Sequence, residues 1–90
     1  MFNMIKERCG IPEDIEVYDA DIRMYLSDCL EDMKSSGVPA RLLNKEKPNP
    51  QTVTAATLYV KAYRGDDRTD TEKYLDLYRK KVFRLTMEAE

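Results

Sequence analysis

The hydrophobic pattern is clearest in the C-terminal half of the chain, residues 50–85. Apolar residues recur there at spacings of three and four, which places them on one side of an α-helix. A tight polar turn divides the pattern into two stretches, and such a turn brings the apolar faces of two helices together. The sequence therefore predicts an αα-hairpin. The two predicted faces are Val53, Ala56, Val60 and Tyr63, flanked by Tyr59, and Tyr74, Leu77, Tyr78, Val82 and Leu85.

Local signals mark the ends of these two helices. Asn49 and Pro50 supply an N-cap and a first-turn proline for the first helix. Gly65 follows the last periodic residue, where a left-handed C-cap is expected. The residues from Thr69 to Glu72 match the S/T-x-x-E capping box, which predicts that the second helix starts near Thr69.

The N-terminal half shows the same helical spacing in two places. Phe2, Ile5 and Cys9 predict a short helix that stops at Gly10, and residues 13–17 are predicted to form a polar connection or a single turn. A longer helix is predicted to end at Gly37. Its apolar face consists of Tyr18, Ile22, Leu26, Cys29 and Met33, with Tyr25 and Leu30 beside it. The predicted fold is all-α, a single domain of residues 1–90. It is a small bundle of about four helices, in which a short N-terminal helix and a long helix precede the C-terminal αα-hairpin.

Residues 40–48 form the one substantial loop of this prediction. A loop of this length in so small a domain often provides a contact surface. A plain crossover that buries its two leucines explains the same segment equally well. The candidate loop contacts are Arg41, Leu42, Leu43, Lys45 and Lys47.

Charge is unevenly distributed along the chain, although the net charge is only −2. Residues 1–37 contain nine acidic and four basic residues, a net charge of −5, whereas residues 38–90 contain eight acidic and eleven basic residues, a net charge of +3. The two parts could attract each other within a subunit or between subunits. Ordinary solvated helix faces account for the same pattern.

The sequence contains no recognisable catalytic machinery. Histidine, the commonest general base and a common zinc ligand, does not occur in the sequence. Phosphate-binding and nucleophile motifs are also missing. Asp66, Asp67 and Asp70 lack the ligand spacing of an EF-hand and are better explained as capping residues. We therefore predict no enzymatic activity, no catalytic or metal-binding residue and no cofactor.

The two cysteines, Cys9 and Cys29, fall near apolar positions and are predicted to be buried free thiols. Free thiols fit synthesis in a reducing cytoplasm. No apolar run approaches the ~20 residues that a membrane span needs. We therefore expect neither secretion nor membrane insertion.

Tyrosines and the basic run at residues 79–84 are the candidates for contacts with other molecules. Six of the eight aromatic residues are tyrosines, whose rings and hydroxyl groups suit both thin cores and protein interfaces. Packing at the rim of the core is the more common role, and most basic runs are solvated. Together with three aspartates of the predicted long helix, the hairpin tyrosines and the basic run make up the candidate subunit-interface residues: Asp21, Asp28, Asp32, Tyr59, Tyr63, Tyr74, Tyr78, Arg79, Lys80, Lys81 and Arg84.

Three segments together resemble the small all-helical head-tail connector, or adaptor, proteins of tailed bacteriophages and prophages. They are G-I-P-E-D-I-E-V-Y-D-A-D-I-R at residues 10–23, which leads into a long helix that ends in S-S-G-V at residues 35–38, T-L-Y-V-K-A-Y-R-G-D-D at residues 57–67, and E-K-Y-L-D-L-Y-R-K-K-V at residues 72–82. The resemblance covers nearly the whole chain. Its motifs are packing and turn signatures rather than catalytic ones.

This resemblance implies a structural virion protein, sometimes described as a DNA packaging protein, that assembles as a ring beneath the portal and extends the DNA channel. The ring is commonly a dodecamer. The implied partners are further copies of the chain, the portal protein, the next neck or tail-completion protein, and DNA that passes through without sequence-specific binding; no membrane is involved. The implied location is the virion neck, after synthesis in the bacterial host cytoplasm.

A closed ring joins two different surfaces of neighbouring subunits. We expect the long acidic helix of one subunit to face the C-terminal helix pair of the next. The alternative is a small helical nucleic-acid-binding or regulatory module of a prophage. The basic loop and the R-K-K run at residues 79–81 favour this alternative, whereas the negative net charge and the lack of a compact helix-turn-helix pattern argue against it.

Overall fold

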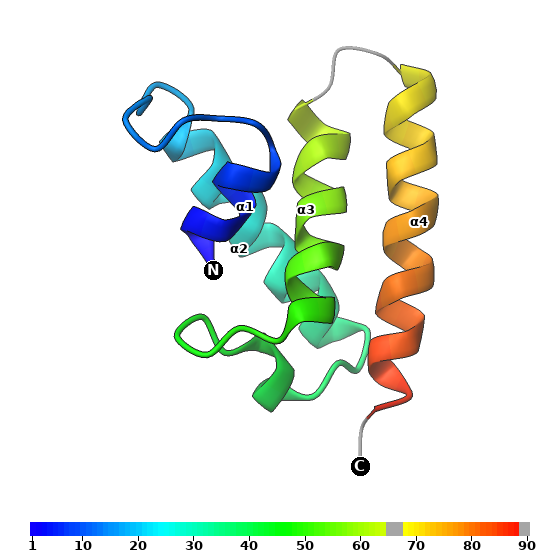
Figure 1. Cartoon of the computed structure of the whole chain (residues 1–90). Coiled ribbons are helices and arrows are strands. Elements are labelled where there is room, and N and C mark those ends of the chain that lie inside the picture. Colours follow the sequence, from blue (N-terminus) through cyan, green and yellow to red (C-terminus); the bar gives the residue numbers. More distant parts are fainter. Residues whose placement is uncertain (65–67, 89–90) are drawn as a thin grey trace.

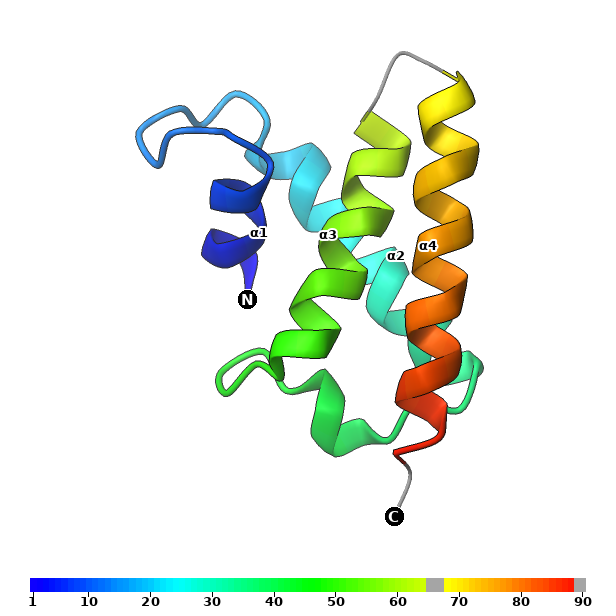
Figure 2. The same cartoon turned by 45° about the vertical axis from the view of Figure 1, so that its right-hand side comes forward.

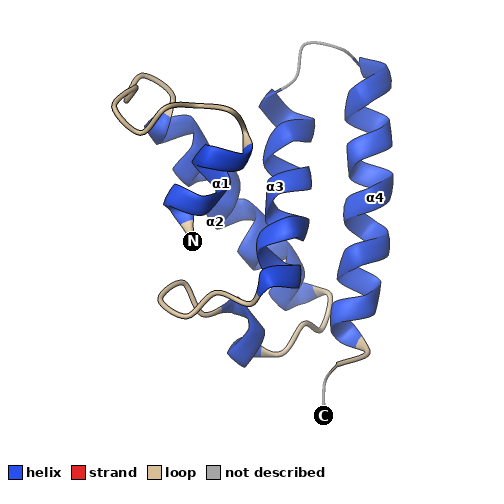
Figure 3. Cartoon of the chain, viewed as in Figure 1, coloured by secondary structure: helices blue, strands red, loops and turns tan. Residues whose placement is uncertain are grey.

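The computed structural model describes residues 1–64 and 68–88, with the backbone alone for Arg68 and Thr69. The described chain is all-helical, as predicted, and contains no strand (Figure 3). Its elements are α1 (Phe2–Arg8), α2 (Asp19–Ser35), the short 3₁₀ helix η1 (Ala40–Leu43), α3 (Pro50–Arg64) and α4 (Arg68–Thr86).

Helix α3 lies at the centre of the subunit and contacts α1, α2 and α4. Figures 1 and 2 show α4 beside α3 in antiparallel orientation, α1 on the other side of α3, and α2 crossing behind it. The chain measures 38 × 31 × 17 Å along its principal axes and is therefore flattened. The predicted hairpin is thus formed by α3 and α4, with the two N-terminal helices packed on α3.

Small side chains explain the central position of α3, because they allow other helices to approach its backbone closely. Seven of its side chains are buried, and five of these are alanine or threonine. The buried residues of α3 are Thr52, Val53, Ala55, Ala56, Thr57, Val60 and Ala62. They fill the core together with the buried apolar residues of α1, α2 and α4, which include Ile5, Ile22, Leu26, Cys29, Met33, Tyr78, Val82 and Leu85.

Three residues of the predicted apolar faces are exposed instead, and those predictions are wrong. Leu77 is 39% exposed because it lies about 100° around α4 from Tyr78, on which the buried side of the helix is centred. Tyr63 is 47% exposed, since it lies in the last turn of α3 near the end of the bundle. Tyr18 precedes α2 and is also exposed, with the guanidinium of Arg64 5.1 Å from its ring centroid.

Most predicted helix ends agree with the structure. The side-chain oxygen of Asn49 accepts hydrogen bonds from the backbone N–H groups of Gln51 at 2.9 Å and Thr52 at 3.3 Å, which is the predicted N-cap. Gly37 follows α2 with a φ of +100°, a conformation that glycine adopts without strain. The predicted C-cap at Gly65 lies outside the described residues.

The predicted capping box is misplaced. Helix α4 begins at Arg68, so Thr69 lies inside the helix and not at its N-cap. The hydroxyl group of Thr71 donates a hydrogen bond to the carbonyl oxygen of Ala62, at 3.0 Å. This contact ties the first turn of α4 to the last turn of α3. The ends of the hairpin therefore depend on a contact between the helices and not only on a local cap.

None of the described helices combines the length and the hydropathy needed to cross a membrane.

Candidate subunit interface

The outer face of α4 carries an exposed aromatic ring surrounded by cations. Phe83 is 66% exposed, and Arg79, Lys80 and Arg84 around it are exposed as well. Lys80 forms an ion pair with Asp76 at 3.1 Å, in which both side chains are largely exposed and which therefore contributes little to stability. We call Arg79, Lys80, Phe83, Arg84 and Met87 the α4 outer face. Met87, one turn beyond Phe83, is 71% exposed.

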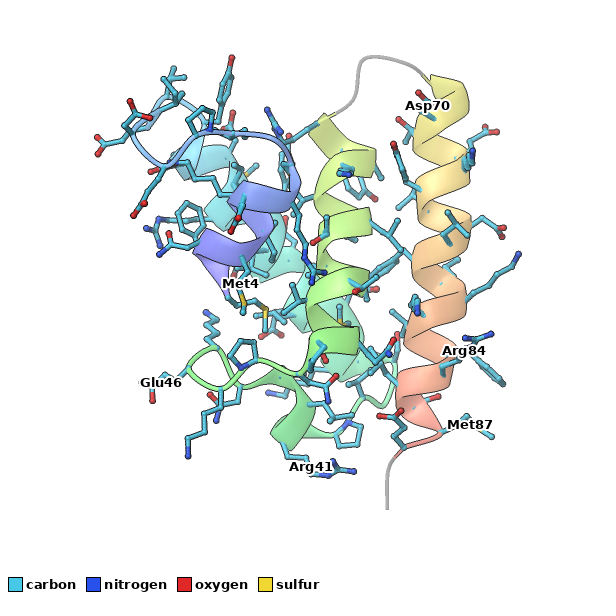
Figure 4. All side chains as sticks on the ribbon, viewed as in Figure 1. Met4, Arg41, Glu46, Asp70, Arg84 and Met87 are labelled. Carbon is cyan, nitrogen blue, oxygen red and sulfur yellow. The ribbon has the colours of Figure 1, made fainter. Side chains whose placement is uncertain are left out.

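Two shallow hollows flank Phe83. One, of about 350 Å³, lies on the outer side of α4 and is lined by Asp76, Arg79, Lys80, Phe83 and Arg84. The other, of about 360 Å³, lies between the end of α2 and α4, where Asp32 and Ser36 face α4 residues that include Phe83. Figure 4 shows the side chains of Arg84 and Met87 extending from the side of α4 that faces away from α3. Phe83 thus forms an apolar ridge between two hollows on a cationic surface.

The remaining cation of the predicted run, Lys81, is half-buried. Its ammonium group donates a hydrogen bond to the side-chain oxygen of Gln51, at 3.0 Å. This bond joins α4 to the first turn of α3. Lys81 is thus occupied within the subunit, whereas the other three cations of the run remain on the surface.

Four tyrosines form a connected row across α2, α3 and α4. The ring centroids of Tyr25 and Tyr63 are 5.9 Å apart, those of Tyr63 and Tyr59 4.7 Å, and those of Tyr59 and Tyr78 5.1 Å. Tyr78 is buried, Tyr25 and Tyr59 are half-buried, and Tyr63 is at the surface. Tyr74 is half-buried and is not part of this row. The exposed tyrosine of this row is Tyr63, so Tyr63 is the member most accessible to another molecule.

Tyr78 connects two residues of α2 to α4. Its hydroxyl group donates a hydrogen bond to the carboxylate of Asp32, at 2.6 Å, and accepts one from the Cys29 thiol, at 3.7 Å. Burial raises the pKa of the Cys29 thiol to about 12 and also raises the pKa of Tyr78. The pKa of Tyr59 is also raised, to about 12. Burial is the largest cause, and the neighbouring Tyr63 is the second.

The raised pKa of Cys29 argues against a nucleophilic role for its thiol. A thiol becomes a nucleophile by losing its proton, and a raised pKa keeps Cys29 protonated. Both cysteines are free, as predicted; Cys29 is buried, and Cys9 is half-buried against the core. Tyr78 and Asp32, two of the predicted interface residues, are paired with each other inside the subunit.

The other two predicted aspartates, Asp21 and Asp28, are exposed on α2. They lie on the side of the helix that faces away from the core, near the exposed Met24. Their carboxylates remain available to a neighbouring molecule. Asp21 also lies in the first turn of α2, where a negative charge is favoured by the helix dipole.

The predicted loop is an ordered crossover with a basic surface. Leu42 is buried and Leu43 half-buried, which confirms that the loop tucks its leucines inward. Arg41 donates a hydrogen bond to the carbonyl oxygen of Glu88, and the N-terminal ammonium group donates one to the carbonyl oxygen of Lys45, at 3.1 Å. Lys47, like Lys45, is exposed. The charged side chains of the loop therefore lie on the surface, while the leucines anchor it.

Phe83 is absent from the interface residues predicted from the sequence. The helical spacing nevertheless indicates that Phe83 is exposed. It follows Val82, which lies on the apolar stripe, and successive residues are about 100° apart around a helix. Ile15 and Val17, exposed apolar residues before α2, were also not included. They lie in a segment without regular secondary structure, where no periodicity indicates which side chains face the solvent.

Comparison with known families gives one match, and comparisons with curated proteins and with solved structures give none. The matching family model is described as phage connector protein, and it covers residues 1–90. This coverage includes all four helices, the crossover loop and the α4 outer face. The family is a structural one, in agreement with the resemblance seen in the sequence. The chain therefore belongs to the phage connector protein family.

Proposed function

We propose that the protein is the subunit of a homo-oligomeric ring that connects the phage portal and capsid to the tail and extends the DNA channel. Membership of the connector family supports a structural role in the virion neck. The α4 outer face supports self-assembly, because Phe83 is exposed at the centre of a cationic surface and no other part of the described chain covers it. The exposed aromatic side chain of Phe83 is the observation that carries the proposal.

A closed ring requires two different surfaces that fit each other on adjacent subunits. The α4 outer face supplies one of them. Two acidic surfaces could supply the other: the outer side of α2 with Asp21 and Asp28, and the segment before α2 with Asp14 and Glu16. Either would place opposite charges across the contact, which favours correct orientation during association.

The contacts with the portal protein and with the next neck or tail-completion protein require surfaces outside this ring contact. The crossover loop is a candidate, since Lys45 and Lys47 are exposed while its backbone is fixed by the N-terminus and by Arg41. DNA would pass through the ring without sequence-specific binding. In this proposal, the loop serves as a docking surface at the end of the bundle that carries η1.

Native mass tests the proposal. Light scattering over a concentration series, with negative-stain images of any large species, should detect a ring of about a dozen subunits. The variant Arg79→Glu/Lys80→Glu/Arg84→Glu should remain monomeric with unchanged helicity in circular dichroism, because it reverses the charge around Phe83. The variant Lys45→Glu/Lys47→Glu/Lys73→Glu makes the same change in net charge elsewhere on the surface and should still assemble. Rings that persist in the first variant would contradict the role of the α4 outer face.

The alternative function, nucleic-acid binding, is supported by the same three exposed cations. Arg79, Lys80 and Arg84 on one side of a helix could contact phosphate groups, and such binding weakens steeply with salt. A protein that stays monomeric at every concentration and retains DNA in a salt-dependent manner would favour this alternative over the ring.

A further inference from the structure

We propose that residues 10–18, here called the link, dock on the α4 outer face of the adjacent subunit and place Ile15 and Val17 against Phe83 and Met87. This inference rests on the proposed ring function and assigns the two surfaces that meet. The contact is heterologous, since the link and the α4 outer face are different surfaces of the same chain.

The link exposes apolar side chains together with acidic ones. Val17 is 75% exposed, and Ile15 is also exposed. Glu13, Asp14 and Glu16 are exposed around them, and the link contains no basic residue. Val17 buries little of its surface within its own chain, and Ile15 leaves 39% of its surface exposed. Burial against another molecule would remove both side chains from water.

A buried cation holds the link in place. The ammonium group of Lys6, in α1, donates a hydrogen bond to the carbonyl oxygen of Glu13, at 2.9 Å, and forms an ion pair with Asp19, also at 2.9 Å. Lys6 is buried, and burying a charge is unfavourable unless it is paired and hydrogen-bonded. These two contacts fix the middle of the link and the start of α2.

Backbone hydrogen bonds add to this order. The N–H of Ile15 donates to the carbonyl oxygen of Pro12, and the N–H of Asp19 donates to that of Glu16, both at 3.1 Å. The link therefore forms two consecutive turns anchored by Lys6. A segment ordered before association loses less conformational entropy on binding. The fold thus presents Ile15 and Val17 in a fixed position on the surface.

The two surfaces are complementary in both charge and polarity. Each has apolar side chains at its centre, and the surrounding charges are negative on the link and positive on the α4 outer face. An apolar centre with a charged rim is the usual arrangement of a protein interface. The hollows of about 350 and 360 Å³ beside Phe83 provide space for branched side chains such as Ile15 and Val17.

The positions of the two surfaces also fit a ring. Figures 1 and 2 both show the link and α4 at opposite sides of the subunit, with α3 between them. A ring of many subunits needs its two contact surfaces on roughly opposite sides. The outer side of α2 fits this requirement less well, because α2 crosses behind α3 and offers Met24 as its exposed large apolar residue.

Chemical cross-linking tests which surfaces meet. The double variant Asp14→Cys/Asp76→Cys places one thiol on the link and one beside the α4 outer face, at exposed residues that are not the proposed apolar anchors. A short bismaleimide should convert this variant into a ladder of covalent multimers. The matched variant Asp28→Cys/Asp76→Cys, with its first thiol on α2, should give no ladder. The wild-type chain, with its two native cysteines, measures the background.

The outcomes separate this inference from the proposed function. A ladder from the link variant alone supports the inference. Large native species with a ladder only from the α2 variant would overturn the inference and leave the ring proposal standing. A protein that remains monomeric at every concentration and gives no ladder would overturn both.

A charge exchange gives a second, independent readout. Glu13→Lys/Asp14→Lys/Glu16→Lys should raise the concentration needed for assembly at least about tenfold, which corresponds to about 1.4 kcal/mol. Combining it with Arg79→Glu/Lys80→Glu/Arg84→Glu in one chain should restore assembly, because both sides of the contact are then reversed. If assembly is restored instead when Asp21→Lys/Asp28→Lys is combined with Arg79→Glu/Lys80→Glu/Arg84→Glu, the contact involves α2 and the inference is wrong.

Discussion

Helices α3 and α4 form one hairpin, but they differ in how much of their surface the rest of the subunit covers. Helix α3 is packed by α1, α2 and α4, and seven of its fifteen residues are buried. Helix α4 buries Tyr78, Val82 and Leu85 and leaves Phe83 to the solvent. Helix α3 therefore organises the fold, whereas α4 has an exposed face that is free to contact another molecule.

The two helices achieve these roles with different side chains. Helix α3 buries alanine and threonine, which allow three neighbouring helices to pack closely. Helix α4 concentrates larger apolar side chains on one stripe and places cations on the remainder. Substitutions on the buried and the exposed sides of α4 should therefore separate effects on folding from effects on the proposed assembly.

Two substitutions on α4 should differ most in their effect on the free energy of unfolding. Leu85→Ala removes a fully buried side chain and should lower the free energy of unfolding by about 2–5 kcal/mol. Phe83→Ala, two residues away, should change it by less than about 0.5 kcal/mol, because the ring is exposed. Chemical unfolding of the monomer, followed by circular dichroism, measures both values. A loss above 1 kcal/mol for Phe83→Ala would show that its ring already packs within the subunit.

Alkaline pH should weaken the contact between α2, α3 and α4. The pKa of Cys29 rises from its ordinary value of 9.0 to about 12 in the folded protein, so the unfolded chain loses this proton at lower pH. The corresponding stability is complete below about pH 9 and is lost between about pH 9 and 12. At pH 10.5, this loss amounts to about 2 kcal/mol. Tyr59 and Tyr78, whose pKa values are also raised, add to the loss above about pH 10.

The variant Cys29→Ala isolates the thiol. Between pH 8 and pH 10.5, the free energy of unfolding should decrease in both proteins. The decrease should be smaller in the variant than in the wild type, by about 2 kcal/mol. Urea unfolding at the two pH values gives this difference for each protein. Equal decreases in the two proteins would mean that the Cys29 thiol does not control alkaline stability.

The smallest expected effect lies in the first turn of α3. The hydroxyl oxygen of Thr52 is buried without a hydrogen-bond partner among the described residues. The hydroxyl group of Thr57, by contrast, donates a hydrogen bond to the carbonyl oxygen of Val53, at 2.8 Å. Thr52→Val should therefore stabilise the fold by up to about 1 kcal/mol, because it removes an unpaired polar group. Thr57→Val should not stabilise it. Thermal unfolding compares the two variants, and destabilisation by Thr52→Val would indicate that its hydroxyl has a partner, such as a buried water.

The sequence alone determined the helices and most of their ends. Periodicity and capping act between residues a few positions apart, so the N-cap at Asn49, the stop at Gly37 and the buried stripe of α2 could be predicted without tertiary information. Arg79, Lys80 and Arg84 fall outside the apolar stripe that the spacing predicts for the second hairpin helix, and all three are exposed. Caps act locally and the spacing of apolar residues is a property of the sequence itself, so both can be recognised without knowing how the helices pack.

The tertiary structure alone decided which helix became central and which surfaces remained free. Amphipathicity indicates that one side of a helix is buried, but not how many partners cover the other sides; it therefore could not distinguish α3 from α4. The pairing of Tyr78 with Asp32 and the burial of Lys6 beside Asp19 join residues that are distant in the chain. Such contacts depend on the positions of whole helices, and they determine which side chains are paired or buried within the chain and which remain exposed.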